Sequence, residues 1–276
     1  MATAAESRDR FSRRQLFGSG FGRALNAHLS LSDGGRPAKP VAVPSSWGEG
    51  DSAALGARLG PAHEALLEAI DVRPGARMLD STAGDGGLAA RAAAAGAAVT
   101  AFEPVEALAE RGRRRTETLP VDWRSAQRAG AAEFDAVVSC FGASHSADPR
   151  RTARQLTRPA ASGAPIALTA WKGLMARVMS IAAPERPGRS ERWSRYETAR
   201  LHFFDFPELS VREHFMCWEF ADADAAHREL SAPVASATGR RRLREALPDL
   251  IELYGRDRDR GLVLRADYVV VFARRP

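Results

Sequence analysis

The sequence from residue 78 to residue 88 reads Met-Leu-Asp-Ser-Thr-Ala-Gly-Asp-Gly-Gly-Leu. Its apolar beginning predicts a short strand that ends at Asp80, and the alanine-rich run that follows predicts a helix. Gly84 and Gly86 allow the backbone of the connecting turn to approach a bound molecule closely, because a Cβ atom would collide there. We therefore predict a strand–turn–helix unit whose glycine turn faces a ligand.

The next apolar run, residues 98–102, ends at Glu103. In nucleotide-binding folds, an acidic residue about 20 residues beyond a glycine turn binds the hydroxyl groups of a ribose. The order of strand, glycine turn, helix, strand and acidic residue thus predicts a site for an adenosine-containing ligand. The alternative interpretation is a tight strand-to-helix connection that binds nothing.

Strands and helices are predicted to alternate along most of the chain, which is typical of an α/β fold with a parallel sheet covered by helices on both faces. Residues 171–208 interrupt the alternation with methionine and aromatic residues in an irregular setting. The expected strands are residues 77–80, 98–102, 121–123, 134–139, 164–170, 209–220 and 263–273, and the expected helices are residues 55–70, 87–95, 104–115, 150–158, 222–230 and 240–254.

The first part of the chain differs in composition from the rest. Residues 1–45 are rich in Ser, Gly and Arg, and we interpret them as a basic N-terminal arm and linker before a domain at residues 46–276. Residues 12–17, Ser-Arg-Arg-Gln-Leu-Phe, resemble a twin-arginine export signal. Glycine and polar residues interrupt the apolar stretch that such a signal requires, so an amphipathic arm is the preferred interpretation.

The net charge is +6, and Lys39 and Lys172 are the only lysines, so arginine supplies nearly all the positive charge. A basic surface can bind nucleic acid or an anionic membrane. Here the arginines are scattered and alternate with acidic residues, as in residues 256–260, which favours a compositional bias instead. Cys140 and Cys217 have neither metal-ligand spacing nor a disulfide pattern, which predicts no metal site and a reducing compartment such as the cytoplasm. We predict no transmembrane segment.

Four segments carry a family resemblance: residues 72–80 with the glycine turn, residues 96–104, residues 134–142 and residues 166–171. In order and spacing they resemble class I S-adenosylmethionine-dependent methyltransferases, and most closely the group that includes the ubiquinone and menaquinone biosynthesis enzymes and small-molecule methyltransferases. The resemblance covers roughly residues 50–276. It implies a Rossmann-like, doubly wound, mostly parallel seven-stranded sheet with an antiparallel last strand.

The resemblance also implies which residues bind S-adenosylmethionine. Glu103 corresponds to the acid that binds both ribose hydroxyls, and Pro104 to a residue that packs on the adenine. Ser125 and Ala126 lie where the family usually has an acidic contact to the adenine amino group, so Ser125 is a departure, as is Asp85 in the turn. The methionine and ribose portion would contact Asp80, Thr82, Ala83, Gly84 and Gly86, and the sulfonium side of the pocket would contact Cys140 and Phe141.

Three groups of side chains are candidates for the chemistry and the acceptor. His145 follows the fourth strand and could act as a general base, although a loop histidine bonded to backbone or water is the simpler interpretation. A buried strand-end residue is a better interpretation of Cys140 than a nucleophile. We interpret residues 171–220 as a lid and acceptor region, in which Trp171, Met175 and Trp193 are our candidates for an apolar acceptor pocket, against the alternative of ordinary core.

These features predict an enzyme that transfers a methyl group to a small, apolar organic acceptor. One alternative is an RNA or protein methyltransferase that uses the basic arm, although the sequence motif of exocyclic-amine methyltransferases is absent. Another is a degenerate cofactor-binding protein that acts as a partner of other proteins. The oligomeric state is left open.

Overall fold

The computed structural model describes residues 53–124, 131–146, 148–184, 192–203, 205–234, 236–258 and 261–276. The arm and linker expected at residues 1–45, and the candidate adenine contacts Ser125 and Ala126, lie outside these described residues. None of the described helices is both long and apolar enough to span a bilayer.

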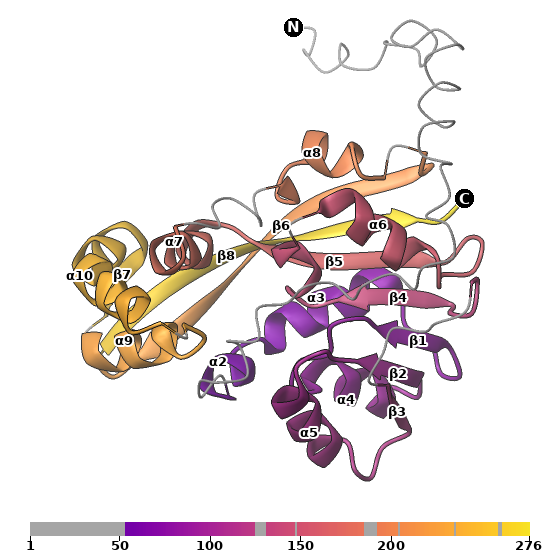
Figure 1. Cartoon of the computed structure of the whole chain (residues 1–276), viewed down its shortest axis with the longest axis horizontal. Coiled ribbons are helices and arrows are strands. Elements are labelled where there is room, and N and C mark those ends of the chain that lie inside the picture. Colours follow the sequence, from indigo (N-terminus) through magenta and orange to yellow (C-terminus); the bar gives the residue numbers. More distant parts are fainter. Residues whose placement is uncertain are drawn as a thin grey trace, which may run out of the picture. The chain divides into compact units, whose positions relative to one another are not determined.

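The described residues form one mixed sheet whose main path has the strand order β3-β2-β1-β4-β5-β8-β6 (Figure 1). The first five strands in this order are parallel, whereas β8 is antiparallel to both of its neighbours. This confirms the predicted Rossmann-like, mostly parallel sheet. The strands on this path are β1 (Arg77–Asp80), β2 (Ala98–Phe102), β3 (Val121–Arg124), β4 (Ala136–Ser139), β5 (Pro165–Trp171), β6 (Glu208–Phe220) and β8 (Gly261–Arg274).

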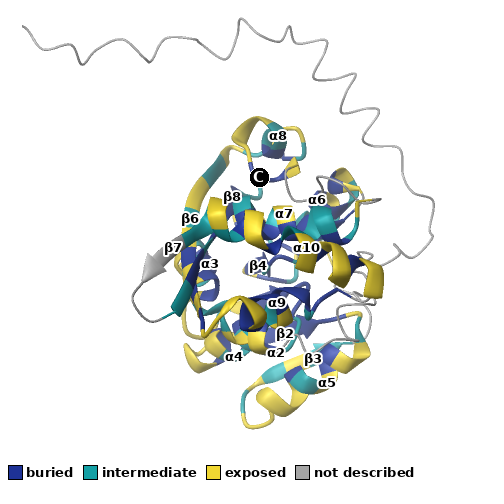
Figure 2. Ribbon diagram, turned by 90° about the vertical axis from the view of Figure 1, so that its left-hand side faces the viewer, coloured by how far each residue is buried: buried dark blue, intermediate teal, exposed yellow. Residues whose placement is uncertain are grey.

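Helices pack on both faces of this sheet, as predicted. One buried cluster includes Leu66, Ala89, Leu174 and Leu243, and the other includes Leu156 with Trp193 and Phe203. The helices are α2 (Ala53–Ala57), α3 (Gly60–Ile70), α4 (Gly87–Ala94), α5 (Glu106–Arg115), α6 (Pro149–Thr157), α7 (Gly173–Ala182), α8 (Tyr196–Arg200), α9 (Ala223–Ser231) and α10 (Ala237–Tyr254). Figure 2 shows their burial: the inner faces are dark blue, and the outward faces of α5, α9 and α10 are yellow.

Several elements differ from the prediction. The helix expected at residues 55–70 is divided into α2 and α3, and α8 is a helix within the segment expected to be irregular. Helix α7 occupies part of the segment expected to be irregular, and its residues Leu174, Met175 and Val178 are buried. No side chain caps the start of this helix, so the sequence carried no helix-start signal there. The short strand β7 (Gly255–Arg258) pairs with β8 and was not predicted, because its charged sequence lacks the pattern of a strand.

Strands β6 and β8 extend past the end of β5 toward α7, α9 and α10, as Figure 1 shows. The β5–β8 pairing ends with Trp171 opposite Tyr268, and beyond this point β8 pairs with β6 and β7. The carboxyl ends of β1, β2, β4 and β5 meet at the edge of the sheet where this extension begins. In open α/β sheets that edge is where ligands bind.

Candidate active site

A pocket opens at the carboxyl edge of the sheet, and four strand ends and the α2–α3 segment form its walls. The empty space within it, counted together with the open solvent at its mouth, is about 820 Å³. The lining residues are Leu55, Gly56, Leu59, His63, Thr82, Ala83, Gly84, Asp85, Leu88, Glu103, Leu108, Cys140, Phe141, Gly142, His145 and Trp171.

The two glycines of the turn have different roles. Gly84 has a left-handed backbone with φ of 56°, and a Cβ atom there would meet no atom within 4 Å, so its space opens to the pocket. Gly86 also has a positive φ, but a Cβ atom there would lie 3.0 Å from Gly112 Cα and 3.1 Å from the Trp123 ring. We predicted that both glycines contact a ligand; the structure places Gly86 against α5 and β3, outside the pocket lining.

Glu103 is held in place by the backbone. Its Oε2 accepts a hydrogen bond of 2.9 Å from the Gly84 amide, and its Oε1 accepts one of 2.8 Å from the Val105 amide. Burial raises the pKa of Glu103, and these two amides partly offset the rise. A carboxylate has about four lone-pair positions, so both oxygens can accept further hydrogen bonds from hydroxyl groups in the pocket.

Asp80 lies fully buried beneath the turn, outside the pocket lining. Within the described residues, neither of its carboxylate oxygens has a well-formed hydrogen bond. Burial raises the pKa of Asp80 to about 7; the nearby Glu103 charge adds to the rise, and the Thr82 amide opposes it. An uncompensated buried carboxylate is costly, so a cationic group near the turn would stabilise its charged form.

Asp85, the unusual residue of the turn, is part of the scaffold as well as of the pocket wall. Its carboxylate accepts a hydrogen bond of 2.6 Å from Arg115 Nη2 and one of 3.3 Å from the Gly87 amide. The first bond is an ion pair to α5, and the second satisfies an amide at the start of α4. The negative charge of Asp85, whose effect could not be inferred from the sequence, is thus balanced by Arg115 on the neighbouring helix α5.

The ends of β4 and β5 bring an aromatic pair to the pocket. Phe141 and Trp171 stack with ring centroids 3.6 Å apart and planes inclined by 5°, and Trp218 contacts Trp171 edge-on. Phe141 has a left-handed backbone with φ of 59°. Its amide donates a 2.8 Å hydrogen bond to Thr169 Oγ1, and its carbonyl accepts one of 2.7 Å from Ser144.

The two candidate reactive residues after β4 line the same pocket. His145 ends a short 3₁₀ helix (Ala143–His145) and is buried. Burial raises the pKa of the Cys140 thiol well above its usual range, and the nearby Asp80 raises it further, while the Thr169 hydroxyl opposes the rise. Cys140 therefore remains a thiol at neutral pH, which supports its interpretation as a strand-end residue rather than a nucleophile.

His63 on α3 is a pocket residue that sequence reasoning missed. Its ring lies against the start of α4, where a Cβ atom on Gly87 would come within 2.7 Å of His63 Cε1. Burial and the charge of Arg91 lower its pKa to about 4, with Asp85 opposing the shift, so the ring is neutral at physiological pH. The sequence pattern placed His63 in the apolar stripe of a helix, and only the packing of α3 over the turn shows that it faces the pocket.

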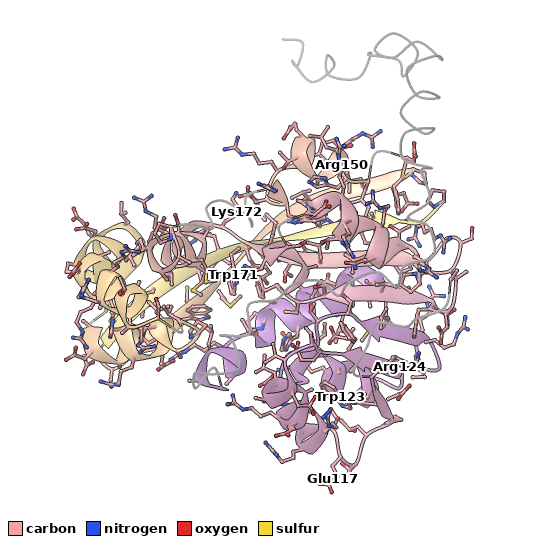
Figure 3. All side chains as sticks on the ribbon, in the orientation of Figure 1. Glu117, Trp123, Arg124, Arg150, Trp171 and Lys172 are labelled. Carbon is pink, nitrogen blue, oxygen red and sulfur yellow. The ribbon has the colours of Figure 1, made fainter. Side chains whose placement is uncertain are left out.

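The remaining candidates lie elsewhere. Met175 is buried in the core cluster that contains Leu174, and Trp193 is buried in the other core cluster, where its ring contacts Phe203. Neither belongs to the pocket lining, and neither does the exposed Pro104. Trp171 is the one of the three candidate acceptor contacts that lines this pocket. Figure 3 labels Trp171 near the junction with the α7, α9 and α10 region.

Comparison of the sequence with known families matches residues 79–168, from β1 to β5, to the methyltransferase domain family. The uncharacterized protein Rv1403c of Mycobacterium tuberculosis is 35% identical over 150 residues, which cover 51% of this chain and 55% of the relative. The uncharacterized protein Rv1405c of the same organism is 31% identical over 153 residues, which cover 52% of this chain and 56% of the relative. The aligned region thus spans about half the length of these relatives.

Solved structures share the fold. The YcgJ protein of Bacillus subtilis has a TM-score of 0.57 at 12% identity and covers 78% of this chain and 98% of its own. A putative methyltransferase of Bacillus halodurans has a TM-score of 0.56 at 16% identity, covering 79% and 100%. A geranyl diphosphate methyltransferase in complex with SAM has a TM-score of 0.51 at 18% identity, covering 85% and 96%. At these identities the comparison establishes the architecture.

Proposed function

We propose that this chain belongs to the class I S-adenosylmethionine-dependent methyltransferase superfamily, as the match of residues 79–168 to the methyltransferase domain family supports. We further propose that it transfers a methyl group from S-adenosylmethionine to a small, largely apolar organic acceptor. The observation that carries this proposal is the carboxylate of Glu103, which accepts a hydrogen bond from the Gly84 amide and lines the same pocket as Phe141 and Trp171. A nucleoside-binding acid and an apolar aromatic wall thus share one cavity.

The residues at the turn fit the cofactor. Both Glu103 oxygens can accept hydrogen bonds from ribose hydroxyls, and Gly84 leaves its space open to the pocket. The Asp80 carboxylate is buried beneath the turn and does not line the pocket, and the positive charge of a methionine ammonium group near the turn would stabilise its charged form. When bound, the cofactor supplies an electrophilic methyl group, and the protein's part is to hold donor and acceptor in line.

The lining of the pocket is predominantly apolar. Leu55, Leu59 and Leu108 belong to it, and Phe141 and Trp171 form an aromatic wall. Pockets for small organic molecules are mostly apolar with a few polar groups that orient the ligand. This composition supports an apolar acceptor. Met175 and Trp193, which we also proposed as acceptor contacts, are buried in the two core clusters and do not line this pocket.

His145 is our proposed general base for an acceptor that must lose a proton. It is buried and lines the same pocket as the aromatic pair, a position consistent with that role. A base contributes to methyl transfer only when the acceptor is protonated in the ground state. Replacement of His145 by Ala should then lower turnover severely while the affinity for S-adenosylhomocysteine is unchanged. Retained turnover would refute this assignment.

The division into a basic arm at residues 1–45 and a methyltransferase domain at residues 46–276 remains part of the proposal, as does a cytoplasmic location. The alternative of an RNA or protein substrate depends on that arm, which lies outside the described residues. A steep loss of RNA binding with increasing salt would support this alternative.

The test of the proposed function is calorimetry with S-adenosylhomocysteine. We expect binding by the wild-type protein and at least about 10-fold weaker binding by Glu103→Gln, because hydrogen bonds to a charged group contribute about 1.5–3 kcal/mol each. Glu106→Gln is the matched control, since Glu106 is exposed and pairs with Arg113 on the outside of α5. The absence of heat and of a thermal shift with the wild-type protein would favour the degenerate alternative and refute the enzyme.

A further inference from the structure

Residues 55–59, which we call the pocket roof, cover one side of the proposed cofactor site. Leu55, Gly56 and Leu59 belong to the pocket lining. The roof packs closely on the glycine turn, because a Cβ atom on Gly56 would lie 3.0 Å from Asp85 Oδ2. Helix α2 also contacts α9, which belongs to the region beyond the end of β5 (Figure 1).

Arg58 is the roof residue that connects these two regions. Its guanidinium donates two hydrogen bonds to Glu229 on α9, from Nε to Oε2 at 2.7 Å and from Nη2 to Oε1 at 3.1 Å. Nη2 also donates a 2.9 Å hydrogen bond to the Glu219 carbonyl on β6. The same group lies over the Phe220 ring, 4.5 Å from its centroid. One side chain thus contacts two elements through four interactions.

This arrangement differs from the exposed ion pairs of the protein. The side chains of Arg58 and Glu229 are 24% and 26% exposed, whereas those of Arg73 and Asp71 are 79% and 74% exposed. A two-pronged, partly buried arginine–carboxylate pair is stronger and more specific in geometry than an exposed pair. Exposed pairs contribute little because water and salt screen them.

The partners of Arg58 lie next to the aromatic wall of the pocket. Trp218 and Phe220 are both buried and alternate along β6, so they lie on the same face of the sheet. Trp218 contacts Trp171 edge-on, with ring centroids 5.9 Å apart. The position of the roof is therefore joined, through Arg58 and β6, to the wall that we assign to the acceptor.

We propose that Arg58 is a positioning residue that holds the pocket roof closed over the cofactor and against the acceptor wall. It acts through Leu55 and Leu59, because Arg58 itself does not line the pocket. Loss of Arg58 opens the roof and shortens the residence time of the bound cofactor. This inference rests on the proposed function for the identity of the ligand, whereas the opening of the roof is independent of it.

The first experiment uses the full chain without ligand. Hydrogen–deuterium exchange of amides in residues 53–67 should be faster in Arg58→Met, which keeps an apolar stem, and in Glu229→Gln, which removes the charge from the α9 side. Arg73→Met is the matched control, because it removes an exposed pair at the other end of α3. Exchange in this segment that equals the wild type in both Arg58→Met and Glu229→Gln would overturn the proposal.

The second experiment measures the dissociation rate of S-adenosylhomocysteine by stopped flow. We expect an increase of at least about fivefold in Arg58→Met, a smaller increase in Arg58→Lys, which keeps the charge but loses the fork, and none in Arg73→Met. An unchanged rate in Arg58→Met, with wild-type binding intact, overturns the positioning role and leaves the proposed function standing. Absence of binding by the wild type overturns the proposed function. The exchange experiment by itself then tests whether Arg58 holds the pocket roof closed.

Discussion

The ring of Phe141 lies parallel to the indole of Trp171, with centroids 3.6 Å apart. Phe141 ends the turn after β4 in a left-handed backbone conformation, which costs a non-glycine residue about 1–2 kcal/mol. The stacking, the hydrogen bond to Thr169 and the bond from Ser144 offset this cost. Backbone strain that the surroundings maintain is common at functional sites, and here it presents an aromatic side chain to the pocket.

Removal of the Phe141 side chain should separate the ring's contribution from the backbone strain. Phe141→Ala should lose about 3–5 kcal/mol of unfolding free energy, because it leaves a cavity against Trp171. Phe141→Gly should be at least as stable as Phe141→Ala, since glycine adopts a positive φ without penalty. Urea denaturation of both variants measures the difference. In helices and strands, glycine is usually less stable than alanine by up to about 1 kcal/mol. If Phe141→Gly were less stable than Phe141→Ala by that amount, the result would contradict a strained conformation at this position.

Gly112 on α5 should not tolerate a side chain. A Cβ atom there would lie 2.0 Å from Cη2 of Trp123, a residue labelled in Figure 3, whose indole also donates a hydrogen bond to Thr116. Gly112→Ala should cost about 1–3 kcal/mol through overpacking, although alanine is the better helix former. Thermal denaturation is the measurement, with the exposed Glu110→Ala as the control. The double variant with Trp123→Leu should recover part of the loss.

Asp80 should make the protein less stable as the pH rises. Its pKa is about 7 in the folded state and about 3.9 when unfolded, so between these values the folded chain holds a proton that the unfolded chain has released. The contribution of Asp80 to the free energy of unfolding is therefore fully present below about pH 4, and it decreases by about 1.4 kcal/mol per pH unit as the pH rises toward 7. Relative to the wild type, Asp80→Asn should gain stability over this window. A difference that does not vary with pH in denaturant titrations would refute the raised pKa.

His63 should have the opposite effect. Its pKa of about 4 in the folded state lies below the unfolded value of about 6.5. Between these values the unfolded chain binds a proton on this ring that the folded chain does not, and this favours unfolding. Stability should fall as the pH decreases from about 6.5 toward 4, and His63→Gln should remove this part of the pH dependence. NMR titration of the imidazole tests the same point directly. A midpoint near 6.5 would show that the ring is not buried as described.

The sequence predicted the sheet well, because β1, β2, β4 and β5 carry short apolar runs and the inner part of β6 alternates buried and exposed residues. The bounds of β1 and β2 agree with the prediction to the residue. The pattern failed at α7, which begins without a capping side chain, and at β7, whose charged residues form a strand because β8 offers a free edge beyond β5. Local signals were absent in both places, and tertiary contacts supplied the structure.

The sequence itself determined how Asp80, Gly84 and Glu103 come together, because they belong to one strand–turn–helix–strand unit whose geometry is local. Only the tertiary structure decided the rest of the pocket. Phe141 meets Trp171 because β4 and β5 are neighbours in the sheet, and Arg58 meets Glu229 across 171 residues of sequence. Such contacts depend on the packing of whole elements against one another, which no short sequence pattern specifies.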